Sequence, residues 1–202
     1  MPKLQDHLLG RLTQRPFDGD DHDEFSDADR QCLRITDNKI FAVSRFQVNF
    51  TTYDVRRDQD SLNPVKQCYV MVRSPETEPD AHPFWYAQVL GVFHATVSIF
   101  PSKESRLEQV LNTRVEFLWV RWFGVEPGDR SGFKYCKLPK IGFVPESDRF
   151  AFGFLDPSVV IRGCHLIPAF AQGRTGRLLR ANSTFARNPG EKKDWINYYV
   201  GM

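Results

Sequence analysis

The stretch VEFLWVRWFGV at residues 115–125 constrains the fold more than any other part of the chain. In an extended strand, successive side chains point to opposite faces. The apolar residues of this stretch fill both faces, with Val115, Phe117, Trp119 and Phe123 on one and Leu118, Val120 and Trp122 on the other. A strand that is apolar on both faces is typical of the centre of a sheet. The sequence therefore predicts a central strand in which Trp119 is buried.

Other segments also show the alternation or the aromatic and β-branched content of strands. We expect strands in segments 39–50, 67–73, 84–100, 141–144 and 149–154. Gly91 lies inside the longest of them and is expected to mark a bulge or sharp bend. The polar segment 57–64 ends in Asn-Pro, which predicts a turn. The chain also contains 13 Pro and 13 Gly residues, and this frequent punctuation disfavours long helices.

One helix is expected near the N-terminus, where Leu4, Leu8 and Leu12 share a helical face within residues 3–13. Short strands at near-regular spacing with few helices predict a mainly β fold, either a bent sheet or a small β-barrel with a short N-terminal helix. We place the β domain at 33–170. An N-terminal helix and acidic loop at 1–32 precede it, and a basic, partly irregular tail at 171–202 follows it.

The net charge is only +2, but its distribution along the chain is uneven. Residues 17–29 hold seven acidic residues and no Lys or Arg, and such a segment is expected to be mobile. Residues 172–193 hold six basic residues and one acid. The two segments could pair with each other, serve different partners or remain solvated loops.

The basic segment supplies the candidate nucleic-acid contacts, which are Arg174, Arg177 and Arg180. Its GRTGR sequence at 173–177 lacks the GxxxxGK pattern of a P-loop, but arginine side chains can clasp phosphate groups. A flexible basic tail without a ligand is the alternative interpretation.

The aromatic residues Trp85, Tyr86 and Trp122 form a second candidate, a recognition surface. Aromatic side chains hold methylated lysine by cation–π attraction and stack on nucleic-acid bases. Packing in the core is the commoner use of such residues, and that alternative stays open.

The sequence shows no pattern of catalysis or metal binding. The four cysteines are too far apart to form a CxxC pair, and they are expected to be buried structural residues; they are Cys32, Cys68, Cys136 and Cys164. The sequence also lacks the GxSxG motif, the nucleophile elbow that carries the catalytic serine of many hydrolases. We therefore expect no catalytic residue, no metal site and no cofactor.

The N-terminal residues do not resemble a signal sequence, and no apolar run approaches 18 residues. These features favour an intracellular protein that is not inserted in a membrane. Both the cytoplasm and the nucleus are compatible with them.

Several strings resemble a domain that recurs in mushroom-forming fungi with transposon-encoded proteins of the Plavaka, or CACTA-like, group. They are TTYDVRRDQDSLNP (51–64), HPFWYAQVLGVF (82–93), FLWVRWFGVEPG (117–128), KLPKIGFVP (137–145) and FGFLDPSVVIRGCHLIPAF (152–170). The resemblance covers roughly residues 1–200. It implies a transposon-derived protein and, with that, a nuclear location.

Two more distant resemblances point the same way. The order of features is similar to a C-terminal domain of plant CACTA transposases. The strings WYAQVLGVF, VEFLWVRWFGVEP and VVIRGCHLI resemble the bromo-adjacent homology fold, with a one-residue departure at Cys164. None of these families supplies catalytic residues. They imply an interaction module that binds protein or chromatin, with direct nucleic-acid binding or an inactive element fragment as alternatives.

Overall fold

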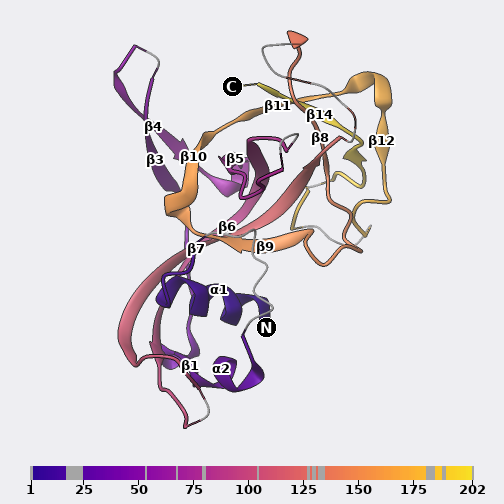
Figure 1. Cartoon of the computed structure of the whole chain (residues 1–202). Coiled ribbons are helices and arrows are strands. Elements are labelled where there is room, and N and C mark those ends of the chain that lie inside the picture. The colour runs from indigo at the N-terminus through magenta and orange to yellow at the C-terminus, as the bar shows by residue number, and fades with distance from the viewer. Residues whose placement is uncertain are drawn as a thin grey trace.

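The computed structural model describes residues 2–16, 25–52, 54–66, 68–78, 81–103, 105–126, 128, 131, 135–180, 185–187 and 190–201. The fold is mainly β, as the sequence predicts (Figure 1). The described residues form two α-helices, α1 (Pro2–Leu12) and α2 (Asp27–Cys32). Neither described helix is long and apolar enough to cross a membrane.

The strands before the central hairpin are β1 (Leu33–Ile35), β2 (Phe41–Val43), β3 (Phe46–Thr51), β4 (Arg57–Leu62) and β5 (Cys68–Arg73). The central hairpin consists of β6 (Phe84–Ile99) and β7 (Val110–Val125). The strands after it are β8 (Lys140–Phe143), β9 (Phe152–Leu155), β10 (Val160–Gly163), β11 (His165–Pro168), β12 (Arg174–Thr175), β13 (Asp194–Trp195) and β14 (Tyr198–Gly201).

The central hairpin organises one large, bent antiparallel sheet. The main path runs β10-β5-β6-β7-β8-β14-β11, while β1 and β2 pair with the distal half of β6 and β9 pairs with β7. Strands β10 and β11 are consecutive in the chain and meet at Cys164, so the bend brings the two ends of the path together (Figure 1). The described strands form no hydrogen-bonded ladder that would close the sheet into a barrel.

The alternation of β6 and β7 distributes their side chains over two faces. One face packs Val89, Val120 and Trp122 into a core with β5 and β10. The other face places Tyr86 and Phe123 in a second core with β8 and β14. Strand β7 is therefore central, as predicted.

Trp119 differs from the prediction, because it is only partly buried and stacks on Phe185 with 5.0 Å between ring centroids.

The predicted irregularity at Gly91 is confirmed. The pairing of β6 with β7 shifts register between Val89 and Gly91. A Cβ atom at Gly91 would lie 2.5 Å from the ring of Phe93, so only glycine fits here without movement of that ring. The bulge lies between the part of β6 that pairs with β5, which ends at Val89, and the part that pairs with β2, which begins at Val92.

The distal half of the hairpin is covered by α1, as its leucine pattern predicts. Leu4, Leu8 and Leu9 are at most 3% exposed and pack with Val97 and Phe117 of the hairpin. Each fully buried leucine contributes about 1.5–3 kcal/mol of transfer free energy before entropy is subtracted. This burial, rather than helix propensity, stabilises a helix interrupted by a glycine.

The acidic segment differs from the expected mobile loop in its second half. Residues 17–24 lie outside the described residues, but Asp27–Cys32 form α2. Ser26 caps this helix through a capping box with Asp29, and Phe25, just before it, is only 3% exposed. Asp27 and Asp29 therefore lie in the first turn of a helix, where the helix dipole stabilises negative charge.

The segment 39–62 also differs from its prediction. The expected strand at 39–50 divides into β2, on the main sheet, and β3, while the expected turn at 57–64 forms β4. Strands β3 and β4 make a hairpin that projects from the body of the molecule (Figure 1). Only Val48 is buried among their residues, and β4, with the sequence RDQDSL, lacks the apolar alternation that would have predicted a strand.

The expected C-terminal tail is part of the fold. Strand β14 lies between β8 and β11 in the main sheet, and Tyr198 and Val200 belong to its core. The boundary placed at residue 171 therefore separates no tail from the domain. The reason is that pairing between β14 and β8, about 57 residues apart, leaves no local signal.

Candidate functional site

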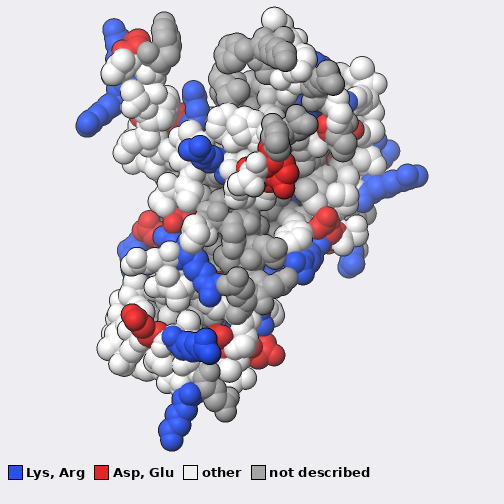
Figure 2. All heavy atoms as spheres, in the orientation of Figure 1, with Lys and Arg blue, Asp and Glu red and all other residues white. Residues whose placement is uncertain are grey.

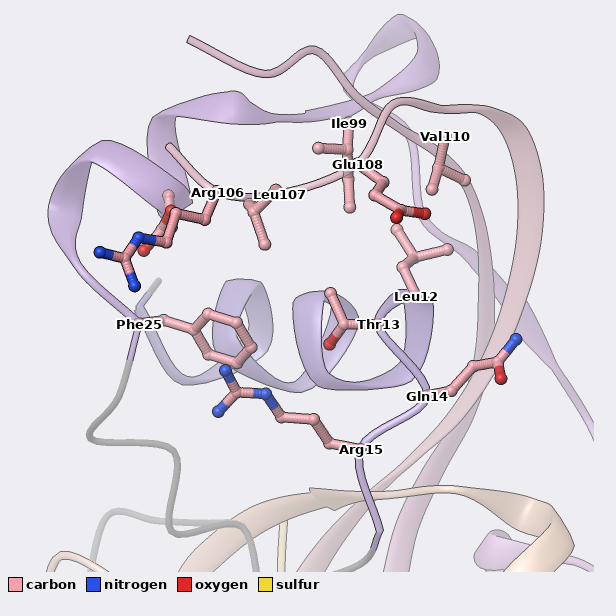
Figure 3. A pocket seen from close by; sticks show the side chains of 11 residues that line it. Leu12, Thr13, Gln14, Arg15, Phe25, Ile99, Arg106, Leu107, Glu108 and Val110 are labelled. Atoms are coloured by element: carbon pink, nitrogen blue, oxygen red, sulfur yellow. The ribbon is translucent and has the colours of Figure 1, made fainter. Parts of the chain in front are cut away.

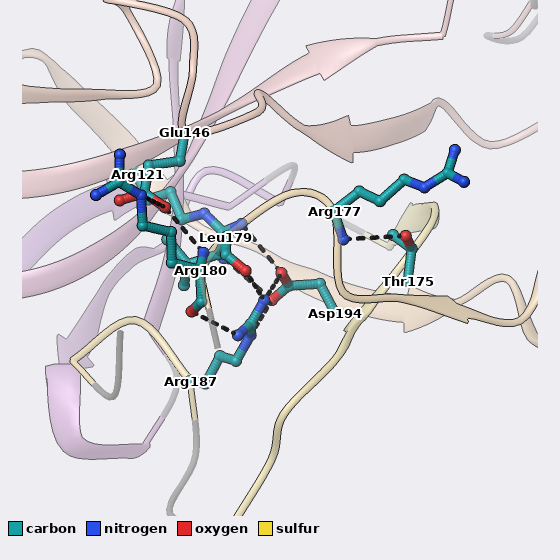
Figure 4. A network of polar contacts seen from close by, with 8 residues as sticks. All are labelled: Arg121, Glu146, Thr175, Arg177, Leu179, Arg180, Arg187 and Asp194. Carbon is teal, nitrogen blue, oxygen red and sulfur yellow. Dashed lines mark hydrogen bonds and ion pairs between the residues drawn. The ribbon is translucent and has the colours of Figure 1, made fainter. Parts of the chain in front are cut away.

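A buried ionic cluster lies beneath the segment that carries the candidate arginines (Figure 4). Arg121 of β7 donates two hydrogen bonds to Asp194 of β13, with N–O distances of 3.1 and 3.2 Å. Arg187 donates two more hydrogen bonds to the same carboxylate, with N–O distances of 3.2 and 2.7 Å. The three residues are 0%, 5% and 8% exposed in the order Arg121, Asp194, Arg187. One carboxylate therefore receives two forked guanidinium groups away from water.

The charges of this cluster do not cancel. Burial alone would raise the pKa of Asp194, but hydrogen bonds and charges from Arg187 and Arg121 outweigh burial and hold the pKa below its ordinary value. Two guanidiniums against one carboxylate leave one excess positive charge. The ring of Phe143, 3.7 Å from the Arg121 guanidinium carbon, offers its negative face to that charge.

The cluster fixes the backbone around it. Arg187 also donates to the carbonyl oxygens of Leu179 at 3.0 Å and Arg180 at 3.2 Å. The ion pair of Arg121 with Asp194 joins β13 to the centre of β7. Residues 179–180 and 194–195 are thus held in fixed positions relative to the main sheet.

The three candidate arginines are exposed above this cluster. Arg180 donates its backbone N–H to Glu146 at 2.8 Å, and its side chain is 87% exposed. Arg177 hydrogen-bonds Thr175 through its backbone, and its guanidinium points away from the buried cluster (Figure 4). Arg174 pairs with Glu191 at 3.6 Å. The predicted residues are therefore accessible, and they lie on a folded segment.

Arg174 also belongs to an aromatic arrangement that the sequence did not predict. Its guanidinium carbon lies 4.4 Å from the ring centroid of Trp195, in cation–π geometry. The ring of Phe170 meets Trp195 edge-on with 5.1 Å between centroids, and Phe170 is 69% exposed. We call Phe170, Arg174 and Trp195 the Phe170–Trp195 surface. Pairing of β12 with β13 places Arg174 directly opposite Trp195.

The predicted aromatic recognition surface is not assembled. Trp85 and Trp122 are in contact, with 5.8 Å between ring centroids, but Trp122 is only 6% exposed and belongs to the core. Tyr86 is 1% exposed and lies in a different core cluster. Residues 85 and 86 are neighbours in a strand, so they point to opposite faces of the sheet. Core packing, the alternative interpretation, describes Tyr86 and Trp122.

All four cysteines are thiols, and none forms a disulfide with another residue that the structure describes. Cys32, Cys68 and Cys164 are buried, as expected, but Cys136 is exposed, so the expectation of burial was wrong for Cys136. Burial raises the pKa of both Cys68 and Cys164 to about 12, so these thiols stay protonated and unreactive at neutral pH. Within the described part of the chain, no three His, Cys, Asp or Glu side chains gather in a way that could hold a metal ion.

Sequence reasoning missed the buried cluster, although one signal was present. Arg121 interrupts an apolar strand at a position that shares its face with Phe117 and Phe123. A charged residue inside a central strand requires a buried partner. That partner, Asp194, lies 73 residues further along the chain, and no local pattern identifies it.

Comparisons of the chain with protein-family models, with curated proteins and with solved structures give no significant match.

Proposed function

We propose that this protein is a non-catalytic interaction module that binds a protein or chromatin partner through the Phe170–Trp195 surface. The observation that carries the proposal is the exposed guanidinium of Arg174, held over the Trp195 ring beside the exposed ring of Phe170. Arginine and aromatic residues dominate the binding energy of protein interfaces.

The rigidity of the surface supports the same proposal. The neighbour of Trp195 in the chain, Asp194, is fixed by two arginines, and Arg174 is fixed by strand pairing and by Glu191. Binding costs about 0.5–1.5 kcal/mol for each long side chain that it immobilises. A surface whose side chains are already positioned avoids much of that cost.

The distribution of charge favours a protein partner over a nucleic acid. Basic and acidic side chains are interspersed on the face seen in Figure 2. A protein that follows a phosphate backbone usually presents lysines and arginines gathered on one face or along one element. Such interspersion suits a partner that itself carries both signs of charge.

A second candidate function is direct, sequence-independent nucleic-acid binding. Arg177 and Arg180 favour it, because both are exposed and lie on the same segment as Arg174. Phosphate contacts position a protein without reading bases, so such binding would not depend on sequence.

The biological setting is proposed from the resemblance alone. A transposon-derived protein that binds chromatin or chromatin-associated proteins would act in the nucleus.

Site-specific photo-crosslinking tests the leading proposal. A photoreactive amino acid at position 170 of the full chain should form adducts with a defined partner in nuclear extract treated with DNase. Position 65 is the matched control, because Val65 is an exposed apolar residue at 87% exposure on a different element. The charge reversal Arg174→Glu should abolish the adduct from position 170.

The proposal requires that crosslinking from position 170 exceed crosslinking from position 65. An adduct that forms equally from positions 65 and 170, or that survives Arg174→Glu, would contradict the proposed surface. Circular dichroism of the Arg174→Glu variant provides the control for folding, since Arg174 is exposed and its replacement leaves the core intact.

Salt-dependent DNA binding tests the second candidate. If it is correct, replacing Arg174, Arg177 and Arg180 with alanine weakens binding to all sequences equally. The slope of log K against log salt should then fall by roughly one for each lost contact. Unchanged DNA affinity in the triple variant would rule out these three contacts.

A further inference from the structure

The projecting hairpin of β3 and β4 has one face that carries only polar side chains. We call residues 46–52 and 54–62 the β3–β4 arm. Three cross-strand pairs share this face, because directly opposite residues of an antiparallel pair lie on the same side of the sheet. The pairs are Gln47 with Ser61, Asn49 with Gln59, and Thr51 with Arg57. All six side chains are exposed, and we call them the outer face of the arm.

The opposite, inner face of the arm anchors it to the body of the molecule. Val48 is buried in the core that contains β5, β6 and β7. The guanidinium carbon of Arg162 in β10 lies 4.7 Å from the ring centroid of Phe50. Asp60 accepts a hydrogen bond from the backbone N–H of Gly163 at 2.8 Å. These contacts hold the inner face against β10, so the outer face is presented to solvent in a fixed direction.

Two side-chain amides meet at the centre of the outer face. Nε2 of Gln59 donates a hydrogen bond to Oδ1 of Asn49 at 2.8 Å. This bond uses one N–H and one lone pair, so each amide retains a donor and an acceptor. The major-groove edge of adenine presents the complementary pair, the N7 acceptor and the N6 amino donor. Asn and Gln are the side chains that most often bind this edge.

The charges of the arm favour a nucleic acid on the outer face. Arg57 is the one charged residue of that face, and it forms no ion pair with any residue that the structure describes. The acids lie elsewhere, since Asp58 and Asp60 belong to the inner face and Asp54 pairs with Arg56 at the tip. An exposed guanidinium on a face without acids fits the O6 and N7 acceptors of guanine.

The shape of the arm suits the major groove of DNA. That groove is about 12 Å wide and admits a two-stranded β-ribbon, whose strands lie about 4.8 Å apart. The minor groove is about 6 Å wide and presents a degenerate pattern of donors and acceptors. The arm stands clear of the body (Figures 1 and 2), so the body does not block its approach to a duplex.

We propose that the outer face of the β3–β4 arm contacts base edges in the major groove of double-stranded DNA. Asn49 and Gln59 bind the edge of an adenine, and Arg57 binds a neighbouring guanine. This site is separate from the Phe170–Trp195 surface. One cation on the face neutralises little phosphate charge, so a sequence preference, rather than tight binding to all DNA, is the expected signature.

Selection from a pool of random duplexes tests the proposal on the full chain. The selection should enrich a short motif that contains adenine and guanine. In fluorescence anisotropy, the wild type should bind the enriched duplex at least tenfold more tightly than a shuffled duplex. Arg57→Ala combined with Gln59→Ala should reduce this preference about tenfold or more, the usual discrimination of bidentate base contacts.

The matched control is Arg106→Ala combined with Gln109→Ala, which also removes one exposed arginine and one exposed amide. Arg106 lies on the segment that joins β6 to β7 beside the helices (Figure 3), at the opposite end of the molecule from the arm (Figure 1). This control should keep the full preference. Phe170→Ala should keep it too, so failure of this site and failure of the Phe170–Trp195 surface are distinguishable.

Modified DNA locates the contact in the major groove. Replacing adenine with 7-deazaadenine removes the N7 acceptor and leaves the base-pairing edge intact. It should weaken binding by the wild type and leave the Arg57→Ala, Gln59→Ala variant unaffected. The proposal is overturned if no sequence is enriched, if the two double variants keep the same preference, or if 7-deazaadenine leaves wild-type binding unchanged.

Discussion

Asp194 is the residue on which the C-terminal geometry depends most, because its carboxylate receives both buried guanidiniums. If it is removed, Arg121 and Arg187 remain in the interior without a counter-ion. Breaking a buried pair in this way costs more than the pair contributed, since the remaining charges cannot return to water.

Asp194→Ala should therefore lower the free energy of unfolding by about 3–5 kcal/mol. Urea unfolding followed by tryptophan fluorescence measures the loss. Glu116→Ala is the control, because Glu116 pairs with Arg114 at the surface, where a pair contributes about 0–1 kcal/mol. Equal losses in the two variants would show that the buried cluster is not a stabilising element.

The lowered pKa of Asp194 also predicts how stability depends on pH. Its carboxylate binds a proton more weakly in the folded chain than in the unfolded chain, so its stabilisation is fully present above the ordinary value of 3.8. That stabilisation is lost as pH falls below this value and through the lower folded pKa. Unfolding free energies of the wild type and Asp194→Asn should converge over this acidic range, and a constant difference would contradict the assignment.

Residue positions were predictable from sequence where alternation applies. The faces of Phe117, Val120 and Phe123 follow from period two, and so does the inward direction of Arg121. The partner of Arg121 could not be predicted, because Asp194 lies far away in the chain. The placement of Trp85 and Tyr86 on opposite faces could have been predicted from the same alternation, because the two residues are neighbours in a strand.

At the scale of elements, the long β6–β7 hairpin links the three cores, and the bulge at Gly91 accommodates the bend between them. Strands β5, β6 and β7 were predictable because each is rich in β-branched and aromatic residues. Strand β3 falls within the strand expected at 39–50, whereas β4 was not predictable, because its sequence RDQDSL lacks the apolar alternation of a half-buried strand.

Gly91→Ala should destabilise the hairpin by about 1–3 kcal/mol, the usual cost of an overpacked core. The new methyl group would meet the ring of Phe93, which is itself stacked on Phe117. A double-mutant cycle with Phe93→Ala isolates this contact, and the cost of Gly91→Ala should largely disappear in that background. Gly124→Ala in β7 is the control, since its nearest atom would lie at 4.0 Å, an ordinary contact.

The interaction free energy between the two substitutions decides whether the Phe93 ring causes the strain. If Gly91→Ala destabilises the Phe93→Ala variant as much as it destabilises the wild type, the strain does not come from contact with the Phe93 ring.

At the scale of the whole molecule, the sheet depends on its C-terminal segment. Strand β14 joins β8 to β11, and Asp194 and Arg187 anchor the same segment to β7. The mainly β class was predictable from the many short strands. The integration of β14 was not, because a strand of only four residues is too short for the alternation of Tyr198 and Val200 to stand out, and its partner β8 lies far away in the chain.

A chain that ends at residue 171 should therefore lose cooperative unfolding and the dispersed methyl signals of a packed core. The comparison is the full chain with Arg174, Arg177 and Arg180 replaced by alanine, which keeps β14 and should unfold cooperatively. If the shortened chain unfolds with the same midpoint as this comparison, the C-terminal segment is a dispensable tail.

We propose that the Phe170–Trp195 surface supplies the binding energy for a protein or chromatin partner. The most direct test is the affinity of the full chain for the partner crosslinked from position 170, measured by calorimetry with purified components. Phe170→Ala and Arg174→Ala should each weaken binding by about tenfold or more, as interface hot spots do, whereas the exposed control Val65→Ala should have almost no effect. Equal affinities for all three variants and the wild type would contradict the claim.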